Sequence, residues 1–282
     1  IVFALQYDAD RVFTEHWLPF ILSLENTGEV LPLEREPIPD APDCVAVVVP
    51  AMKRPQNVAP LVESVRKTAP EANVYFVCDP DDHEQIDAVM ASDAYLIVSQ
   101  RGHCYAIKSN VALESTSEPW LFVCGDDVEF KPGWLTEARK LSDRFDVIGT
   151  NDSGDGRIRN PDVAAGRHAD HAFFRRSYIE EYGACLDGPG VLAPECYQHW
   201  WVDKEQIELA KARGVFTPCL ESVVQHNHPG FDGREDLRAE DHAYMLAVEA
   251  AEEDRKTYLT RAPLIQMQRT AWRLIEFPIT ER

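Results

Sequence analysis

Hydrophobic residues in the middle of the chain alternate between short continuous runs and stretches with helical spacing. Residues 44–50 (CVAVVVP) form a β-branched run typical of a strand buried on both faces. Residues 57–69 (NVAPLVESVRKTA) follow with the spacing of an amphipathic helix. The alternation continues and predicts strands at 72–79, 94–99, 120–127 and 145–150, and helices at 82–92, 104–116 and 133–143.

Strands that alternate with helices of this length indicate crossover units. We therefore predict an α/β fold: a single Rossmann-like domain with a mainly parallel central sheet flanked by helices. Ligands of such sheets bind beyond the carboxyl ends of the strands. Asp79 and the pair Asp126–Asp127 stand at two of these ends, so chemistry is expected there.

Beyond residue 150 the alternation becomes less regular. Residues 151–168 form a glycine- and charge-rich loop that is long enough to act as a lid or as a binding loop. After it, the pattern predicts a strand and a helix over 169–183, a helix over 203–214, a strand over 215–229 and a helix over 235–256. We divide the chain into an N-terminal extension with a proline-rich connector (1–43), a main α/β domain (44–232) and a C-terminal helical cover (233–282).

Composition limits the partners. The formal net charge is −20, with acidic and basic residues interspersed. Because such a surface repels phosphate backbones, nucleic acid is disfavoured as a partner. No apolar stretch approaches the roughly 20 residues of a membrane span, and the opening residues lack the basic segment of a signal peptide. The seven cysteines show no C-x-x-C spacing and indicate reduced thiols, which favours a cytoplasmic protein.

The stretch LFVCGDDVEFKPGWL (121–135) places two adjacent carboxylates, Asp126 and Asp127, at the end of an apolar run. Two such charges repel each other unless a positive group lies beside them. Mg²⁺ or Mn²⁺ would fit, because these ions prefer carboxylate oxygens and complete their shells with phosphates. The alternative is that Asp126 caps the following turn while Asp127 is solvated.

Two further motifs could contribute to the same chemistry. His226 and His228 alternate along a predicted strand and therefore face the same side, as metal ligands or as ordinary packing residues. Asp203 and Glu205 stand at a predicted helix start, where a carboxylate is either a cap or a general base.

The chain resembles the GT-A nucleotide-sugar glycosyltransferases, closest to the family 2-like group. The resemblance lies in the order of its motifs, which are VVVPAMKRPQN, YFVCDPDD, YAIKSNVAL, LFVCGDDVEFKPGWL, HWWVDKE and VVQHNHP. The resemblance covers residues 44–232. Its most specific parts are the acidic pair with its continuation, and the late D-K-E followed by H-x-H-P.

The resemblance implies a donor site for a nucleoside-diphosphate sugar. Pro50 and Arg54 match the loop that lies along the nucleoside. Asp79 matches the carboxylate that binds the base, usually uracil, which favours UDP. Lys108 and Asn110 match helix positions near the ribose and phosphate.

The resemblance also implies a metal site for Mn²⁺ or Mg²⁺. Gly125, Asp126 and Asp127 fill the family's D-x-D slot, with Asp127 as the direct ligand and Asp126 beside the donor. Gly125 replaces the first aspartate of many relatives. His226 or His228 matches the late metal-binding histidine.

The implied reaction is transfer of a sugar to an acceptor hydroxyl, with inversion at the anomeric carbon. Asp203 matches the catalytic base, and Glu205 is the other candidate for that role. The same residues also fit a metal-dependent hydrolase or an inactive nucleotide-sugar-binding module. A nucleotidyltransferase fits less well, because residues 50–57 (PAMKRPQN) lack a glycine-rich loop. The sequence does not identify the acceptor.

Overall fold

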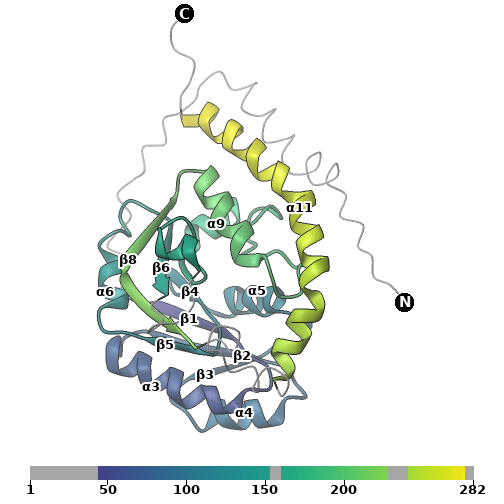
Figure 1. Cartoon of the computed structure of the whole chain (residues 1–282). Helices are drawn as coiled ribbons and strands as arrows, with labels where there is room; N and C mark the ends of the chain where they lie inside the picture. Colours follow the sequence, from purple (N-terminus) through teal and green to yellow (C-terminus); the bar gives the residue numbers. More distant parts are fainter. Residues whose placement is uncertain (1–43, 153–159, 228–240, 277–282) are drawn as a thin grey trace, which may run out of the picture.

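The computed structural model describes residues 44–152, 160–227 and 241–276 (Figure 1). The predicted extension (1–43) and His228 lie outside these residues, as does part of the predicted lid loop. Among the described residues, no helix is both long enough and apolar enough to cross a bilayer.

An eight-stranded sheet forms the centre of the molecule, in the order β3-β2-β1-β4-β7-β6-β8-β5. The strands are β1 (Val45–Pro50), β2 (Asn73–Cys78), β3 (Tyr95–Val98), β4 (Trp120–Val123), β5 (Val128–Phe130), β6 (Val147–Asp152), β7 (Ala172–Arg175) and β8 (Phe216–His226). All were expected from the sequence except β5, whose three residues are too few to show a pattern.

The sheet is mixed, so the prediction of a mainly parallel sheet was wrong. Strands β1 to β4 pair in parallel, as does β6 with β8. In contrast, β7 runs antiparallel to both β4 and β6, and β5 runs antiparallel to β8. Parallel neighbours need a long crossover, whereas antiparallel neighbours do not. The described part of the connection from β6 to β7 contains only the short helix α7 (Pro161–Ala164).

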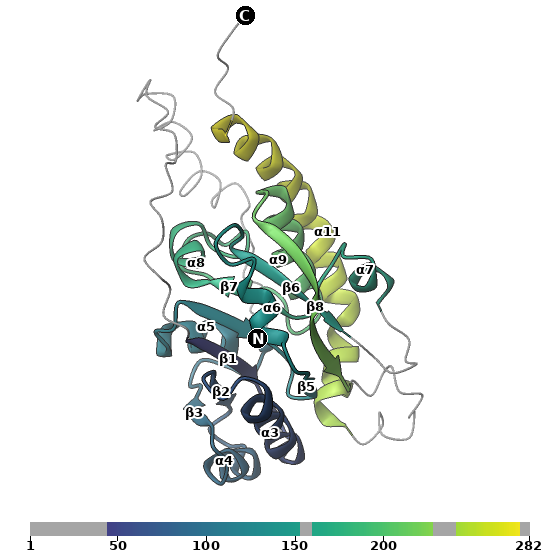
Figure 2. The same ribbon diagram turned by 90° about the vertical axis from the view of Figure 1, so that its left-hand side faces the viewer.

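Helices cover both faces of the sheet (Figures 1 and 2). They are α3 (Val58–Thr68), α4 (His83–Met90), α5 (Tyr105–Ser115), α6 (Trp134–Arg139), α8 (Arg176–Tyr182), α9 (Val202–Ala212) and α11 (His242–Glu276), with a 3₁₀ turn η2 (Pro55–Asn57). Alternate residues of β1 face opposite sides: Val47 packs towards α3, α4 and α6, and Val48 packs towards α5, α8 and α9. The continuous apolar run of β1 therefore fills two cores at once.

Helix α11 runs along the outside of the molecule beside α9 (Figure 1). It lies within the predicted C-terminal cover and extends further along the chain than the helix expected over 235–256. Its contacts with the loop before α9 bring residues from the end of the sequence next to the carboxyl ends of the strands.

Candidate active site

A cavity of about 720 Å³ lies at the carboxyl ends of β1 and β4. Its walls come from the segments after β1 and β4, from the start of α9, from the end of β8 and from α11. The lining includes Pro50, Arg54, Lys108, Asp126, Asp127, Asp170, Trp200, Trp201, Asp203, His226, Tyr244 and Ala247. Most of the residues expected at the site from the sequence thus share one cavity.

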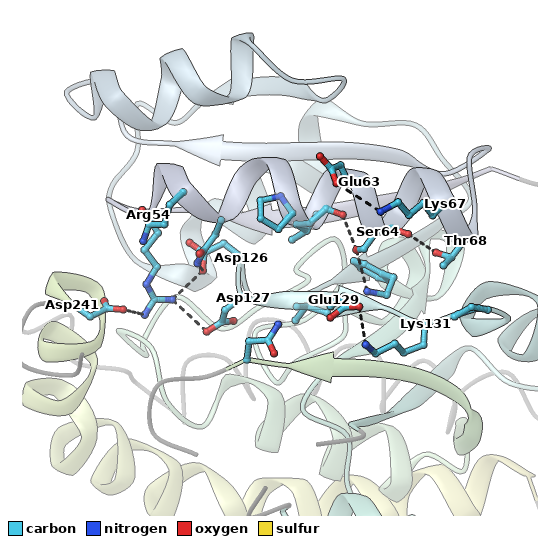
Figure 3. A pocket seen from close by; sticks show the side chains of 18 of the residues that line it. Arg54, Glu63, Ser64, Lys67, Thr68, Asp126, Asp127, Glu129, Lys131 and Asp241 are labelled. Atoms are coloured by element: carbon cyan, nitrogen blue, oxygen red, sulfur yellow. Dashed lines mark hydrogen bonds and ion pairs between the residues drawn. The ribbon is translucent and has the colours of Figure 1, made fainter. Parts of the chain in front are cut away.

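Arg54 supplies the positive charge beside the acidic pair (Figure 3). Its Nη1 lies 2.9 Å from Oδ1 of Asp126 and 3.5 Å from Oδ2 of Asp127, and its Nη2 lies 2.8 Å from Oδ2 of Asp241. Burial raises the pKa of Asp126 to about 6, although the charge of Arg54 opposes this shift. The pair is therefore partly neutralised by the protein itself.

A second cavity, of about 870 Å³, lies on the other side of Arg54 between α3 and β5 (Figure 3). Two of its lysines are engaged with neighbouring carboxylates: Lys67 lies 3.7 Å from Glu63, and Lys131 lies 2.7 Å from Glu129. No histidine lines it among the described residues. The chemistry is therefore concentrated in the first cavity.

Pairing between β5 and β8 brings His226 to the acidic pair. Val128 is the register partner of His226, and the amide of Asn227 donates to the carbonyl of Asp127 at 2.8 Å. As a result, Nε2 of His226 lies 3.2 Å from Oδ1 of Asp127. The imidazole and the carboxylate come from distant parts of the sequence but face each other.

Asp152 and Asp170 complete a group of metal-ligating side chains around His226. One ligand atom from each of Asp152, Asp170 and His226 lies within 4.8 Å of the other two. Burial and the charge of Asp203 raise the pKa of Asp170 to about 6, so a cation here would be favoured. Carboxylate oxygens with one imidazole form a donor set that suits Mn²⁺.

Asp203 faces the cavity from the first turn of α9, and its side chain is 40% exposed. Nε2 of His168 lies 3.0 Å from Oδ2 of Asp203 and 3.5 Å from Oδ1 of Asp170. Burial would raise the pKa of Asp203, but the hydrogen bond and charge of His168 outweigh that effect and lower it. Asp203 is therefore held as a carboxylate in a fixed position.

Asp79 and Lys108 pair at the end of β2. Nζ of Lys108 lies 2.8 Å from Oδ2 of Asp79 and also donates to the carbonyl of Ala51 at 2.7 Å. Nδ1 of His103 lies 3.0 Å from Oδ1 of Asp79, and His103 itself is largely exposed. Lys108 and His103 line the cavity, whereas Asp79, which contacts both of them, is buried and does not line it.

Two residues expected at the site are used elsewhere. The Asn110 amide bonds to the backbone of Leu192 and Ala193 and is buried. Glu205 is fully buried, with both oxygens 2.6 Å from the Arg261 guanidinium and one 2.8 Å from the Tyr197 hydroxyl. Neither side chain lines the cavity, so the structure does not bring them together with the others.

Three residues of the site were missed in the sequence. Asp152 ends β6, and the rule that identified Asp79 at a strand end would have identified it too. His168 and Asp170 precede β7 in the cluster RHADH, whose density of metal-ligating residue types was a usable signal. The sequence pattern there predicts only a loop followed by a strand.

Models of known protein families find no match in this chain, and no curated protein sequence matches it. Solved structures do match. A mannosyltransferase from Pyrobaculum calidifontis, in complex with GDP-Man and Mn²⁺, has a TM-score of 0.51 at 15% identity, covering 96% of this chain and 86% of that one. Glucosyl-3-phosphoglycerate synthase from Mycobacterium tuberculosis, in complex with phosphoglyceric acid, has a TM-score of 0.50 at 12% identity, covering 74% and 80%.

S. aureus TarS has a TM-score of 0.50 at 16% identity, and the match covers 64% of this chain but only 36% of TarS. Against the shorter TarS 1–349 the match covers 60% of that chain, so this chain spans less than two thirds of either. These likenesses establish the fold. The resemblance to GT-A glycosyltransferases seen in the sequence is confirmed at that level.

Proposed function

We propose that this chain is a metal-dependent glycosyltransferase that moves a sugar from a nucleoside-diphosphate sugar to an acceptor hydroxyl. One observation carries the proposal. Two members of the group of metal-ligating side chains, Asp170 and His226, line the cavity together with Asp203, a carboxylate on α9 that is oriented by a histidine. A metal site facing a fixed base is the arrangement that such a transfer needs.

Asp127 and His226 would hold the ion, with Asp152 and Asp170 beside them. The carboxylates suit both Mn²⁺ and Mg²⁺, and the imidazole favours Mn²⁺ over Mg²⁺, which prefers oxygen ligands. When bound, the ion neutralises the diphosphate leaving group as negative charge develops on it. Asp126 shares Arg54 with Asp127 and would lie beside the donor.

Asp203 is the proposed general base. Its carboxylate accepts the proton of the acceptor hydroxyl, whose oxygen attacks the anomeric carbon opposite the departing diphosphate and inverts that centre. His168 holds Asp203 in place and stabilises its negative charge. Glu205 and Asn110 are assigned structural roles, because their polar atoms already bond to the protein.

The donor base would lie near Asp79, between Pro50 and Arg54, where a carboxylate can accept from a uracil N–H. Lys108 fixes the orientation of Asp79. UDP is therefore the first nucleotide to test. GDP is the second, since the Pyrobaculum mannosyltransferase was solved with GDP-Man.

Calorimetry tests the proposal. We would titrate UDP and GDP into the protein with and without Mn²⁺, and into Asp127→Asn, with Asp143→Asn on the surface as the matched control. Binding that needs Mn²⁺ and disappears only in Asp127→Asn is the expected result. If neither nucleotide binds in the presence of Mn²⁺, the proposal is wrong, and release of phosphate or sugar in a hydrolase assay becomes the next measurement.

A further inference from the structure

One face of α11 holds the segment that carries the proposed base. Residues 247, 254, 258 and 261 of α11 lie at helical spacing along one side. Each contacts the segment 198–205: the carbonyl of Ala247 accepts from Nε1 of Trp200 at 2.7 Å, and Arg261 pairs with Glu205. This face of α11 therefore contacts residues that precede Asp203 in the sequence and residues that follow it.

Asp254 makes the densest of these contacts. Its side chain is almost completely buried, and it accepts three backbone hydrogen bonds, each at 2.9 Å. The donors are the successive amides of Gln198, His199 and Trp200. Successive amides that converge on one point form an anion-binding nest. Here the anion is a carboxylate of the protein itself, and charge-assisted bonds of this kind are stronger than neutral ones.

The next residue carries a strained backbone. Trp201 has φ +72°, in the left-handed region that non-glycine residues rarely occupy. Such a conformation persists only where surrounding contacts enforce it. On one side Asp254 fixes the preceding amides, and on the other the Trp201 ring stacks on Tyr258, with centroids 4.9 Å apart. Helix α9 begins immediately afterwards, and Asp203 is its second residue.

Asp254 is not needed to attach α11 to the domain. Two to three turns further along, Arg261 pairs with Glu205, and the buried Ile265 packs against Leu186 and Leu209, so the helix is already anchored there. The three amides also sit in a loop, where water could satisfy them at little cost in stability. What only Asp254 adds is a single conformation for the backbone that leads into Asp203.

We propose that Asp254 is a positioning residue for the transfer reaction, acting through the 198–201 backbone on the Asp203 carboxylate. The inference rests on the proposed role of Asp203 as base. It deepens that role by assigning its orientation to a helix near the end of the chain. A base displaced by about 1 Å can lose on the order of 100-fold in rate.

The test compares Asp254→Asn with Glu253→Gln in the full chain. Asp254→Asn keeps the shape of the side chain. It replaces one carboxylate oxygen, which accepts hydrogen bonds from the amides, with an NH₂ group, which can only donate. The second makes the same charge change at an exposed position of the same helix. We would measure kcat, donor KM and hydrogen exchange of the peptide covering 198–205. Tyr258→Leu is the second variant, because it loosens Trp201 and leaves the Asp254 carboxylate intact.

In Asp254→Asn we expect faster exchange in 198–205, kcat lower by at least about 10-fold and donor KM within about twofold of wild type. Tyr258→Leu should shift the same quantities less, and Glu253→Gln should shift none. Unchanged exchange, or faster exchange with unchanged kcat, would overturn the inference, as would equal losses in Glu253→Gln. If the wild-type protein transfers no sugar, the proposed function fails, and the exchange comparison alone then decides whether Asp254 holds the loop.

Discussion

Nε2 of His226 lies 3.2 Å from Oδ1 of Asp127, although His226 ends β8 and Asp127 precedes β5 in a distant part of the chain. The contact exists because the short strand β5 directly follows Asp127 and pairs with the end of β8. An imidazole and a carboxylate that are held face to face by two paired strands form a rigid part of a metal site.

Replacing His226 with Gln should weaken Mn²⁺ binding by more than about 100-fold, beyond the 10- to 100-fold that loss of a supporting residue behind a ligand causes. The physical reason is that Gln cannot supply the imidazole nitrogen. Calorimetric titration of Mn²⁺ measures the effect. His83→Gln, at an exposed position on α4, is the control and should bind Mn²⁺ like wild type.

Replacing Asp203 with Asn should lower kcat by about 10²- to 10⁴-fold, the usual contribution of a general base. Donor binding should persist, because the ligands proposed for the ion are Asp127 and His226 and not Asp203. Steady-state kinetics together with UDP calorimetry measure both. Glu208→Gln, further along α9, is the matched control. Turnover close to wild type in Asp203→Asn would show that another group takes the proton.

Glu205→Gln should destabilise the protein by about 3–5 kcal/mol, because it leaves the buried guanidinium of Arg261 without its bidentate partner. Arg261→Met should cost a similar amount. The double variant Glu205→Gln/Arg261→Met should cost clearly less than the two losses added together, since the residues share one interaction. Urea unfolding of the four proteins measures the coupling, and additive losses would contradict the pairing.

Gly183→Ala should be much more destabilising than Gly214→Ala. Both glycines have nearly the same left-handed backbone, with φ +74° and +73°. An added Cβ at Gly183 would lie 1.8 Å from the carbonyl oxygen of Gly188, whereas at Gly214 it would meet no heavy atom within 4 Å. Gly214→Ala therefore carries only the backbone strain, about 1–2 kcal/mol. Equal midpoints in thermal unfolding would show that the Gly188 carbonyl moves away freely.

Local pattern was sufficient for most elements of the fold. The β-branched run of β1 and the apolar spacing of α3 predicted their structures because burial on two faces, or along one stripe, constrains residue type directly. Strand direction was less accessible. The antiparallel placement of β7 depends on which neighbours it meets in the sheet, and a four-residue strand carries no signal of that choice.

The candidate site divides in the same way. Asp127, Asp203 and His226 could be identified from the sequence because each lies in a motif, and the order of these motifs along the chain resembles that of a known family. Glu205 has the residue type and helix position of a base, yet Arg261 buries it as an ion pair. Asn110 was expected beside the donor, but its side-chain amide instead forms hydrogen bonds with loop 192–195. In both cases the deciding partner lies far away in sequence.

The sequence by itself thus determined the elements, the α/β class and the residue types available for a metal and a base, because these depend on local periodicity and side-chain chemistry. The tertiary structure alone decided which carboxylates meet. Pairing of β5 with β8 placed His226 beside Asp127. The docking of α11 placed Arg261 beside Glu205, which is therefore buried in an ion pair. Contacts between segments remote in sequence are set by packing and burial of the whole chain, and no short stretch contains that information.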